Sequence, residues 1–297
     1  MSPLAKLYLK HLGLKQQEPS FEYLCLLQKK HIETIPHENI DGIYNIASSF
    51  DIPDLLNKYL IENRGGMCFE LNYSFGWLLH ELGFQVEMLL ADVRAYDLHK
   101  ENNAYPTHPI NIVHLDSVKF VADVGWCDSY RHPLALETTE YTDATGKYRI
   151  IPTEDEKYVM QKWFEPTWVD QFVFDKPIGP RENYSYPERF LAAHAYTHVG
   201  NGYLFTTLFK FTKVHAEGHR TIWGDQLLTR QAEQKDSKPL VKLISTTLEE
   251  DFQVPAKIAQ QCVPITRSLS MMFSRRPVKE KELLQTLQSN KLTLSNT

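Results

Sequence analysis

Apolar positions along the first part of the chain recur with the period of an α-helix. The pattern predicts helices over residues 3–13, 21–33, 52–61 and 68–82. Ser20 and Asp51 stand where helix N-caps are expected, and Gly83 follows the fourth helix at the place where glycine often ends one. The chain up to residue 85 is therefore expected to be mostly helical.

The period changes after this point, where short segments rich in β-branched and aromatic residues alternate with turn-forming stretches. They predict strands over residues 84–93, 110–115, 119–124, 147–151, 158–164 and 169–174, and further along over 203–211 and 221–228. We also expect a connecting helix over 180–197, a strand followed by a helix over 240–252, and a loosely packed C-terminal tail. The predicted architecture is α+β, with a helical bundle, an antiparallel β-barrel and a smaller α/β region.

Composition narrows the classes of function. The chain of 297 residues has a net charge of −5 and a pI near 6.2, whereas nucleic-acid-binding proteins usually carry a clustered basic face. Lys6, Lys10 and His11 interrupt the apolar positions of the N-terminus, so no signal peptide is expected. No apolar run approaches the ~18 residues that span a bilayer. We expect a protein with neither a nucleic-acid nor a membrane partner.

The four cysteines bear on metal binding and on location. They are widely spaced, at Cys25, Cys68, Cys127 and Cys262, without any Cys-x-x-Cys pair. This spacing favours neither a zinc site nor a disulfide framework. The simplest interpretation is a cytoplasmic protein with free thiols and no bound metal.

Cys68 has the local setting of a nucleophile. Arg64-Gly65-Gly66 allows a tight turn before the helix that begins at about Cys68. Backbone N–H groups and the helix dipole at such an end stabilise a thiolate, which is the reactive form of cysteine. The same N–H groups can stabilise the oxyanion that forms when a carbonyl is attacked.

His108 and Asp123 are the predicted base and its orienting acid. His108 lies where a loop enters a strand, and Asp123 lies near the end of the next strand, where an unpaired carboxylate would be costly to bury. A turn at Asp116-Ser117 makes the two strands antiparallel neighbours, with positions summing to about 231 opposite each other. The hairpin therefore predicts a His–Asp pair.

Each of these residues also has a purely structural interpretation. Cys68 could be a small buried side chain, His108 a satisfied loop histidine and Asp123 a turn or N-cap residue. His114 and His37 are rival bases. His114 lies in the middle of an apolar strand, which favours a structural role, and His37 could line a pocket. The joint positions of the first three residues favour a nucleophile, a base and an acid.

Five segments resemble motifs of the arylamine N-acetyltransferase family. RGGMCFELN at 64–72 is similar to its nucleophile signature RGG-x-C-x-E-x-N. YLKHLGL at 8–14 and IPHENID at 35–41 resemble its N-terminal helix and its IPFENLD segment. Thr107-His108 and DVGW at 123–126 match its histidine and aspartate motifs. The motifs cover residues 1–130 in the right order, and beyond them the resemblance is general.

The resemblance implies a fold, a donor and a mechanism. It implies a helical bundle at 1–85, a β-barrel at 86–197 and an α/β lid at 198–297, around a cysteine-protease-like Cys-His-Asp core. It implies acetyl-CoA as donor and ping-pong transfer, through an acetyl-cysteine, to a small arylamine, hydrazine or related amine. Candidate substrate-binding or CoA-binding residues are His37, Phe69, Thr107, Gly125, Trp126 and Cys127.

Two of those residues depart from the family pattern. His37 stands where the family usually has phenylalanine, and Cys127 stands where a glycine usually follows the aspartate motif. Both departures bear on the choice of acceptor.

Two other functions use the same residues. A cysteine hydrolase or transglutaminase-like enzyme would act on water or amides with the same triad, and a degenerate family member would only bind a ligand. Thioester consumption that depends on added amine favours the transferase. Rapid alkylation of one thiol near neutral pH separates an enzyme from an inert binder.

Overall fold

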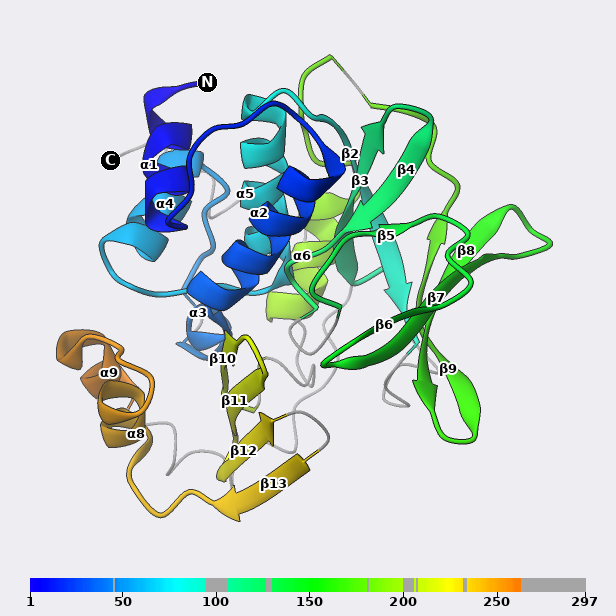
Figure 1. The fold of residues 1–297 in the computed structure, drawn as a ribbon. Helices are drawn as coiled ribbons and strands as arrows, with labels where there is room; N and C mark the ends of the chain where they lie inside the picture. Colours follow the sequence, from blue (N-terminus) through cyan, green and yellow to red (C-terminus); the bar gives the residue numbers. More distant parts are fainter. Residues whose placement is uncertain are drawn as a thin grey trace.

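The computed structural model describes residues 1–44, 46–94, 106–126, 130–180, 182–199, 206, 208–231 and 234–262. Cys127, the connection from 200 to 205 and the C-terminal tail lie outside these ranges, so the expectations placed on them stay untested. In Figure 1 the N-terminal helices, drawn in blue and cyan, lie to one side of a green barrel, and a second sheet in yellow lies below both.

The four predicted N-terminal helices are confirmed to within two residues at each end. They are α1 (Pro3–His11), α2 (Phe21–Thr34), α4 (Ile52–Leu60) and α5 (Cys68–Glu81). Ser20 caps α2 as expected, since its Oγ accepts a hydrogen bond of 3.1 Å from the Tyr23 amide. The short helix α3 (Ile40–Tyr44) was not predicted. Apolar side chains of α1, α2, α4 and α5 share one core, which includes Tyr8, Leu24, Leu27, Tyr59, Leu71 and Phe75.

An eight-stranded antiparallel sheet forms a nearly closed barrel. Its strand order is β5-β4-β3-β2-β9-β8-β7-β6. The strands are β2 (Gln85–Val93), β3 (His108–Leu115), β4 (Val118–Ala122), β5 (Leu134–Ala135), β6 (Tyr141–Asp143), β7 (Gly146–Pro152), β8 (Lys157–Phe164) and β9 (Thr167–Asp175). The segment that follows β5 reaches β7 near the other end of the sheet, where the Ile150 amide donates to the Thr138 carbonyl at 2.8 Å. The antiparallel barrel predicted for this region is therefore present.

The hairpin between β3 and β4 has the predicted turn but a different register. Opposite positions sum to 233, as in the pair Leu115 and Val118, instead of about 231. Asp116 and Ser117 both lie in the turn, and Asp116 has a φ of 54°. The turn is therefore centred between these two residues, which moves every pairing by two.

A second, five-stranded sheet combines one strand from the N-terminal part of the chain with four strands from its C-terminal part. Its order is β1-β10-β11-β12-β13, from β1 (His37–Glu38), β10 (Lys210–His215), β11 (Gly218–Trp223), β12 (Gln226–Gln231) and β13 (Gln234–Pro239). Helices α8 (Ile244–Glu250) and α9 (Ala256–Gln261) share a core with it, which includes Phe209, Phe211, Ile222, Leu248 and Phe252. Because β1 lies between α2 and α3 in sequence, this sheet connects the C-terminal region directly to the helical part.

Some predictions in this region were wrong in detail, and the strand β13 was missed. The strand expected over 221–228 is a hairpin, because Gly224 turns the chain with a φ of 59°. The connecting helix is α6 (Phe190–Val199) and begins ten residues later than 180, after Pro187. β13 was missed because its sequence QKDSKP is polar throughout and carries no apolar alternation.

The division of the chain near residues 85 and 197 stays a prediction. Within the described ranges, no helix combines the length and apolar character needed to cross a membrane.

Candidate active site

The loop before α5 is held by close backbone contact with β1. The Gly66 amide donates to the Pro36 carbonyl at 3.3 Å, and the Glu38 amide donates to the Gly66 carbonyl at 3.0 Å. A Cβ atom added at Gly65 would lie 1.7 Å from the Pro36 carbonyl oxygen. Glycine is needed here because two backbones approach each other closely. The result is a fixed start for α5 at Cys68.

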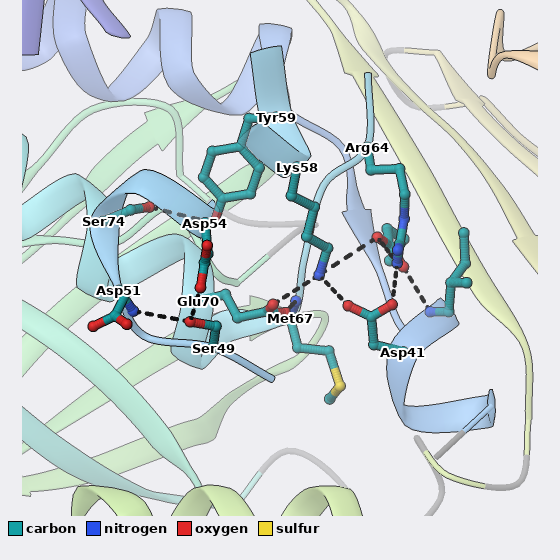
Figure 2. Close-up of polar contacts among 12 residues, drawn as sticks. Asp41, Ser49, Asp51, Asp54, Lys58, Tyr59, Arg64, Met67, Glu70 and Ser74 are labelled. Atoms are coloured by element: carbon teal, nitrogen blue, oxygen red, sulfur yellow. Dashed lines mark hydrogen bonds and ion pairs between the residues drawn. The ribbon is translucent and has the colours of Figure 1, made fainter. Parts of the chain in front are cut away.

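A buried ion-pair network lies behind this loop (Figure 2). Lys58 Nζ lies 2.7 Å from both Glu70 Oε1 and Asp41 Oδ2, and Arg64 Nη2 lies 2.8 Å from Glu38 Oε1 and 2.7 Å from Asp41 Oδ1. Burial opposes ionisation of Asp41, but Lys58 and Arg64 lower the pKa of that carboxyl below its usual value. Asp41 therefore stays ionised, and the network joins β1, α3, α4, the loop and α5.

Glu70 links this network to the first turn of α5. One carboxylate oxygen accepts from Lys58, and the other, Oε2, accepts from the Met67 amide at 3.0 Å. The second contact satisfies one of the backbone donors that a helix leaves unpaired at its N-terminus. A charge network that reaches α5 therefore helps to set where this helix begins.

His108 and Asp123 form a buried pair, as the hairpin predicted. His108 Nε2 lies 2.7 Å from Asp123 Oδ2. Burial alone would lower the pKa of His108, but the charge of Asp123, its hydrogen bond and a weaker hydrogen bond with Cys68 raise the pKa to about 10. The imidazole is therefore expected to be protonated at neutral pH.

Cys68 lies against His108 of this pair. Its thiol contributes a hydrogen bond to His108, and Sγ lies 4.0 Å from the Thr107 carbonyl. Because Nε2 of His108 faces Asp123, Nδ1 is the ring atom left for the thiol. A Cβ atom added at Gly125 would lie 2.7 Å from Cys68 Cα, so the segment after Asp123 packs directly on the start of α5. The structure thus brings the three predicted residues together.

The other predicted site residues lie around this centre, within the described ranges. The rings of Trp126 and His108 meet edge-on with centroids 4.8 Å apart. Phe69 is buried and packs on Phe190 of α6. His37 is also buried, and burial, Lys210 and His108 together hold its pKa well below the usual value.

His114 is not part of the centre. Its Nε2 lies 3.5 Å from Glu87 Oε2, toward the other end of β3, which agrees with the structural role expected for it. Sequence reasoning assigned no role to Asn72, although it closes the RGGMCFELN motif. Asn72 Nδ2 donates to Asp123 Oδ1 at 2.8 Å. Gln28 was also missed, and its Oε1 accepts from the Asp123 amide at 3.1 Å. No local signal marks Gln28, because 95 residues separate it from its partner.

A family model described as N-acetyltransferase matches residues 20–260. The chain belongs to the arylamine N-acetyltransferase family. It is 29% identical over 215 residues to the arylamine N-acetyltransferase / N-hydroxyarylamine O-acetyltransferase of Salmonella typhimurium, covering 68% of this chain and 75% of that protein. It is 33% identical over 160 residues to the arylamine N-acetyltransferase of Escherichia coli, covering 52% and 55%.

Solved arylamine N-acetyltransferases share the fold. The Salmonella typhimurium structure has a TM-score of 0.78 at 20% identity and covers 89% of this chain and 99% of that one. The Mycobacterium marinum enzyme, solved in complex with CoA, has a TM-score of 0.77 at 20% identity, with the same coverage of 89% and 99%. Arylamine N-acetyltransferases are acyltransferases, and this protein is an enzyme of that class.

Proposed function

We propose that the protein transfers an acetyl group from acetyl-CoA to a small amine or hydrazine through an acetylated Cys68. The observation that carries the proposal is the buried His108–Asp123 pair beside a thiol at a helix N-terminus. A raised pKa keeps His108 as an imidazolium, and an imidazolium favours the adjacent thiolate. Relatives named arylamine N-acetyltransferases and a neighbour solved with CoA support the choice of donor and acceptor.

The first half-reaction acylates the enzyme. The Cys68 thiolate attacks the thioester carbonyl, so a new S–C bond forms and the bond from carbonyl carbon to CoA sulfur breaks. His108 gives its proton to the departing CoA sulfur. Amide groups of the first turn of α5, which have no partner within the helix, would stabilise the oxyanion. CoA leaves as a thiol.

The second half-reaction returns the enzyme to its starting state. The amine nitrogen attacks the acetyl carbonyl on Cys68 while neutral His108 takes the proton that the nitrogen loses. The S–C bond breaks, and the thiolate is restored beside the imidazolium. Asp123 holds the imidazole ring in one orientation and stabilises its charged form throughout. Ping-pong kinetics follow from this sequence.

The acceptor and the CoA chain would contact the residues around Cys68. We place His37, Phe69, Thr107, Gly125, Trp126 and Cys127 at these contacts. We infer that the five-stranded sheet with α8 and α9 acts as a lid over the core formed by the helical bundle and the barrel. A free thiol nucleophile fits the cytoplasm, where thiols stay reduced.

The deciding experiment is intact-protein mass spectrometry after incubation with acetyl-CoA alone. We expect a gain of one acetyl group, which peptide mapping assigns to Cys68 and which a Cys68→Ala variant does not acquire. Adding an aromatic amine should then remove the group and yield acetylated amine. If CoA is released equally fast with and without amine, the protein acts as a hydrolase and the proposal is wrong. No reaction with any thioester would leave only a binding role.

A further inference from the structure

The β3–β4 ladder stops one step short of the catalytic pair. Residue pairs 115/118, 113/120 and 111/122 face each other across this hairpin. In a two-residue hairpin these alternate pairs exchange hydrogen bonds, and the next such pair would be Pro109 with Val124. Pro109 has no amide hydrogen, so it cannot complete that pair. The strands separate here, directly beside His108 and Asp123.

A side-chain amide from α5 takes the place of the missing peptide contact. Asn72 Nδ2 donates to the Pro109 carbonyl at 2.7 Å, and Asn72 Oδ1 accepts from the Val124 amide at 2.9 Å. The same Nδ2 donates to Asp123 Oδ1 at 2.8 Å. Asn72 is fully buried, and both ends of its carboxamide are engaged, which defines its orientation. The carboxamide therefore bridges the gap between the two strands.

We propose that Asn72 is the positioning residue of the reaction, an inference that rests on the proposed function of the three residues it connects. Asn72 lies one helical turn after Cys68, so its backbone moves with the nucleophile. Its side chain is bonded to the residue that follows His108 and to Asp123 itself. One side chain thus sets the relative positions of nucleophile, base and acid.

The contact acts on the chemistry of His108 through Asp123. Asp123 Oδ2 faces His108, while Oδ1 accepts from Asn72 Nδ2 and from the Gly125 amide, each at 2.8 Å. Without Asn72, Asp123 Oδ1 loses one of its two hydrogen-bond donors, so the Asp123 carboxylate is held less firmly in its orientation toward His108. Its charge then acts less strongly on the imidazole, and the pKa of His108 falls from about 10.

Asparagine is the residue type that fits this place. Aspartate would place a carboxylate oxygen at the position of Nδ2, against the Pro109 carbonyl and the Asp123 carboxylate, which are both acceptors. Glutamine is one methylene longer, and there is no spare room: a Cβ atom added at Gly125 would lie 2.7 Å from Asn72 Nδ2. Gly125 is therefore needed to let the segment after Asp123 reach the carboxamide.

The test compares Asn72→Ala with a matched change on the same helix. Ser74→Ala also removes a buried polar side chain from α5, but Ser74 Oγ bonds with the hydroxyls of Tyr8 and Tyr59 and touches none of the three reacting residues. We would measure Tm, the titration of His108 by NMR of the labelled imidazole, and single-turnover acetylation at varied acetyl-CoA. Where the alanine variant does not fold, Asn72→Ser carries the same prediction.

A positioning role for Asn72 predicts a specific pattern of results. In the Asn72 variant the pKa of His108 should fall by about one unit or more. The acetylation rate constant should fall about 10- to 100-fold with an unchanged half-saturating acetyl-CoA concentration. Ser74→Ala should lower Tm and leave both quantities as they are. A folded Asn72 variant with the parent's His108 titration and acetylation rate overturns the proposal. If the parent itself gains no acetyl group, the proposed function fails, and the His108 titration still decides the role of Asn72.

Discussion

The Nε2 atom of His108 lies 2.7 Å from Oδ2 of Asp123, with the two side chains 3% and 0% exposed. A carboxylate at this distance from a buried imidazole favours the imidazolium and leaves the other ring nitrogen, Nδ1, for Cys68. An asparagine side chain in place of Asp123 is uncharged and would not favour the imidazolium. The Asp123→Asn exchange therefore keeps the shape of the site and removes its electrostatic component.

Asp123→Asn should lower turnover by about 10⁴-fold, the cost seen when the acid of a comparable triad becomes an amide. The measurement is steady-state acetylation of an arylamine, with circular dichroism and Tm as checks of folding. Asp143→Asn is a suitable control, since Asp143 is a hydrogen-bonded barrel aspartate that accepts from the Arg131 amide. A folded Asp123→Asn enzyme with near-parental turnover would move the role to another acid.

The thiols should differ strongly in their reaction with iodoacetamide. Burial, followed by the charge of Glu22, raises the pKa of Cys25 to about 11, and burial, followed by the charge of Glu38, raises the pKa of Cys262 to about 11. Both are then protonated at pH 7, whereas Cys68 has an imidazolium beside it. We expect Cys68 to be alkylated at least tenfold faster than the other two, as measured by peptide mass spectrometry. Equal rates for the three thiols would contradict an activated nucleophile.

His31 and His108 should give the enzyme a stability optimum near pH 6.5. Burial, with a smaller contribution from His11, lowers the pKa of His31 from 6.5 to about 3. Below pH 6.5 the unfolded chain binds a proton that folded His31 does not, which costs about 1.4 kcal/mol per pH unit. The pKa of His108 is raised to about 10, so its stabilisation is complete below pH 6.5 and is lost as pH rises from there to 10.

Urea unfolding between pH 5 and pH 9 separates the two contributions. His31→Gln should flatten the acid side of the profile and leave the alkaline side unchanged, and His108→Gln should do the reverse. The hydroxyl of Tyr8 lies 2.7 Å from His31 Nε2, and the glutamine amide can replace that contact. An acid slope in His31→Gln that equals the parent's would show that other groups control the acid limb.

Local patterns were enough for the helices and the hairpin, and long-range contacts account for what they missed. The helix that starts at Cys68 could be predicted because its cap, its glycines and its apolar period lie within a few residues of one another. The His108–Asp123 pair could be predicted because a short turn brings the strands together, although the register was displaced by two. In both cases the prediction was possible because the residues that determine the structure lie close together in the sequence.

Asn72 and Lys58 show why the rest of the site could not be predicted. Asn72 bonds to residues 37 to 52 positions away, and an asparagine inside a helix carries no sign of such partners. Lys58 looks like an exposed charge of an amphipathic helix but is buried among carboxylates from three other segments. Only the assembled fold turns these polar residues into site residues.

Lys58→Met should destabilise the protein by about 3–5 kcal/mol. The exchange removes one of the two cations of the buried network and leaves the carboxylates of Glu38, Asp41 and Glu70 with Arg64 as the remaining cation of that network. Urea unfolding measures the loss. Lys242→Met is the control, since Lys242 pairs with Glu250 at 2.6 Å on the surface and should leave Tm unchanged. The double variant Lys58→Met/Glu70→Gln should recover part of the loss. Equal unfolding free energies for Lys58→Met and the parent would show that the network contributes nothing.

This chain has His37 where the family usually has phenylalanine, and we expect this difference to change which acceptors the enzyme prefers. Burial and the charges of Lys210 and His108 hold the pKa of His37 well below the usual value, so the ring is neutral at pH 7 and acts as a hydrogen-bonding group. A neutral polar ring in place of phenylalanine should favour acceptors that carry a polar group next to the amine. His37→Phe should therefore raise kcat/KM for apolar arylamines.

A panel of arylamines and hydrazines tests this with the parent, His37→Phe, Cys127→Gly and the double variant. One pocket contact is worth about 1–3 kcal/mol, which corresponds to a gain of about 10- to 200-fold in kcat/KM for apolar arylamines. The acetylation of Cys68 by acetyl-CoA alone, followed by mass spectrometry, separates donor effects from acceptor effects, and it should change far less than the acceptor profile.

Because burial suppresses protonation of His37, the preference for polar acceptors should also be the same at pH 6 and pH 8. Identical profiles in all four proteins would exclude both side chains from acceptor choice, and a preference that changes between the two pH values would show that His37 titrates in the acceptor complex.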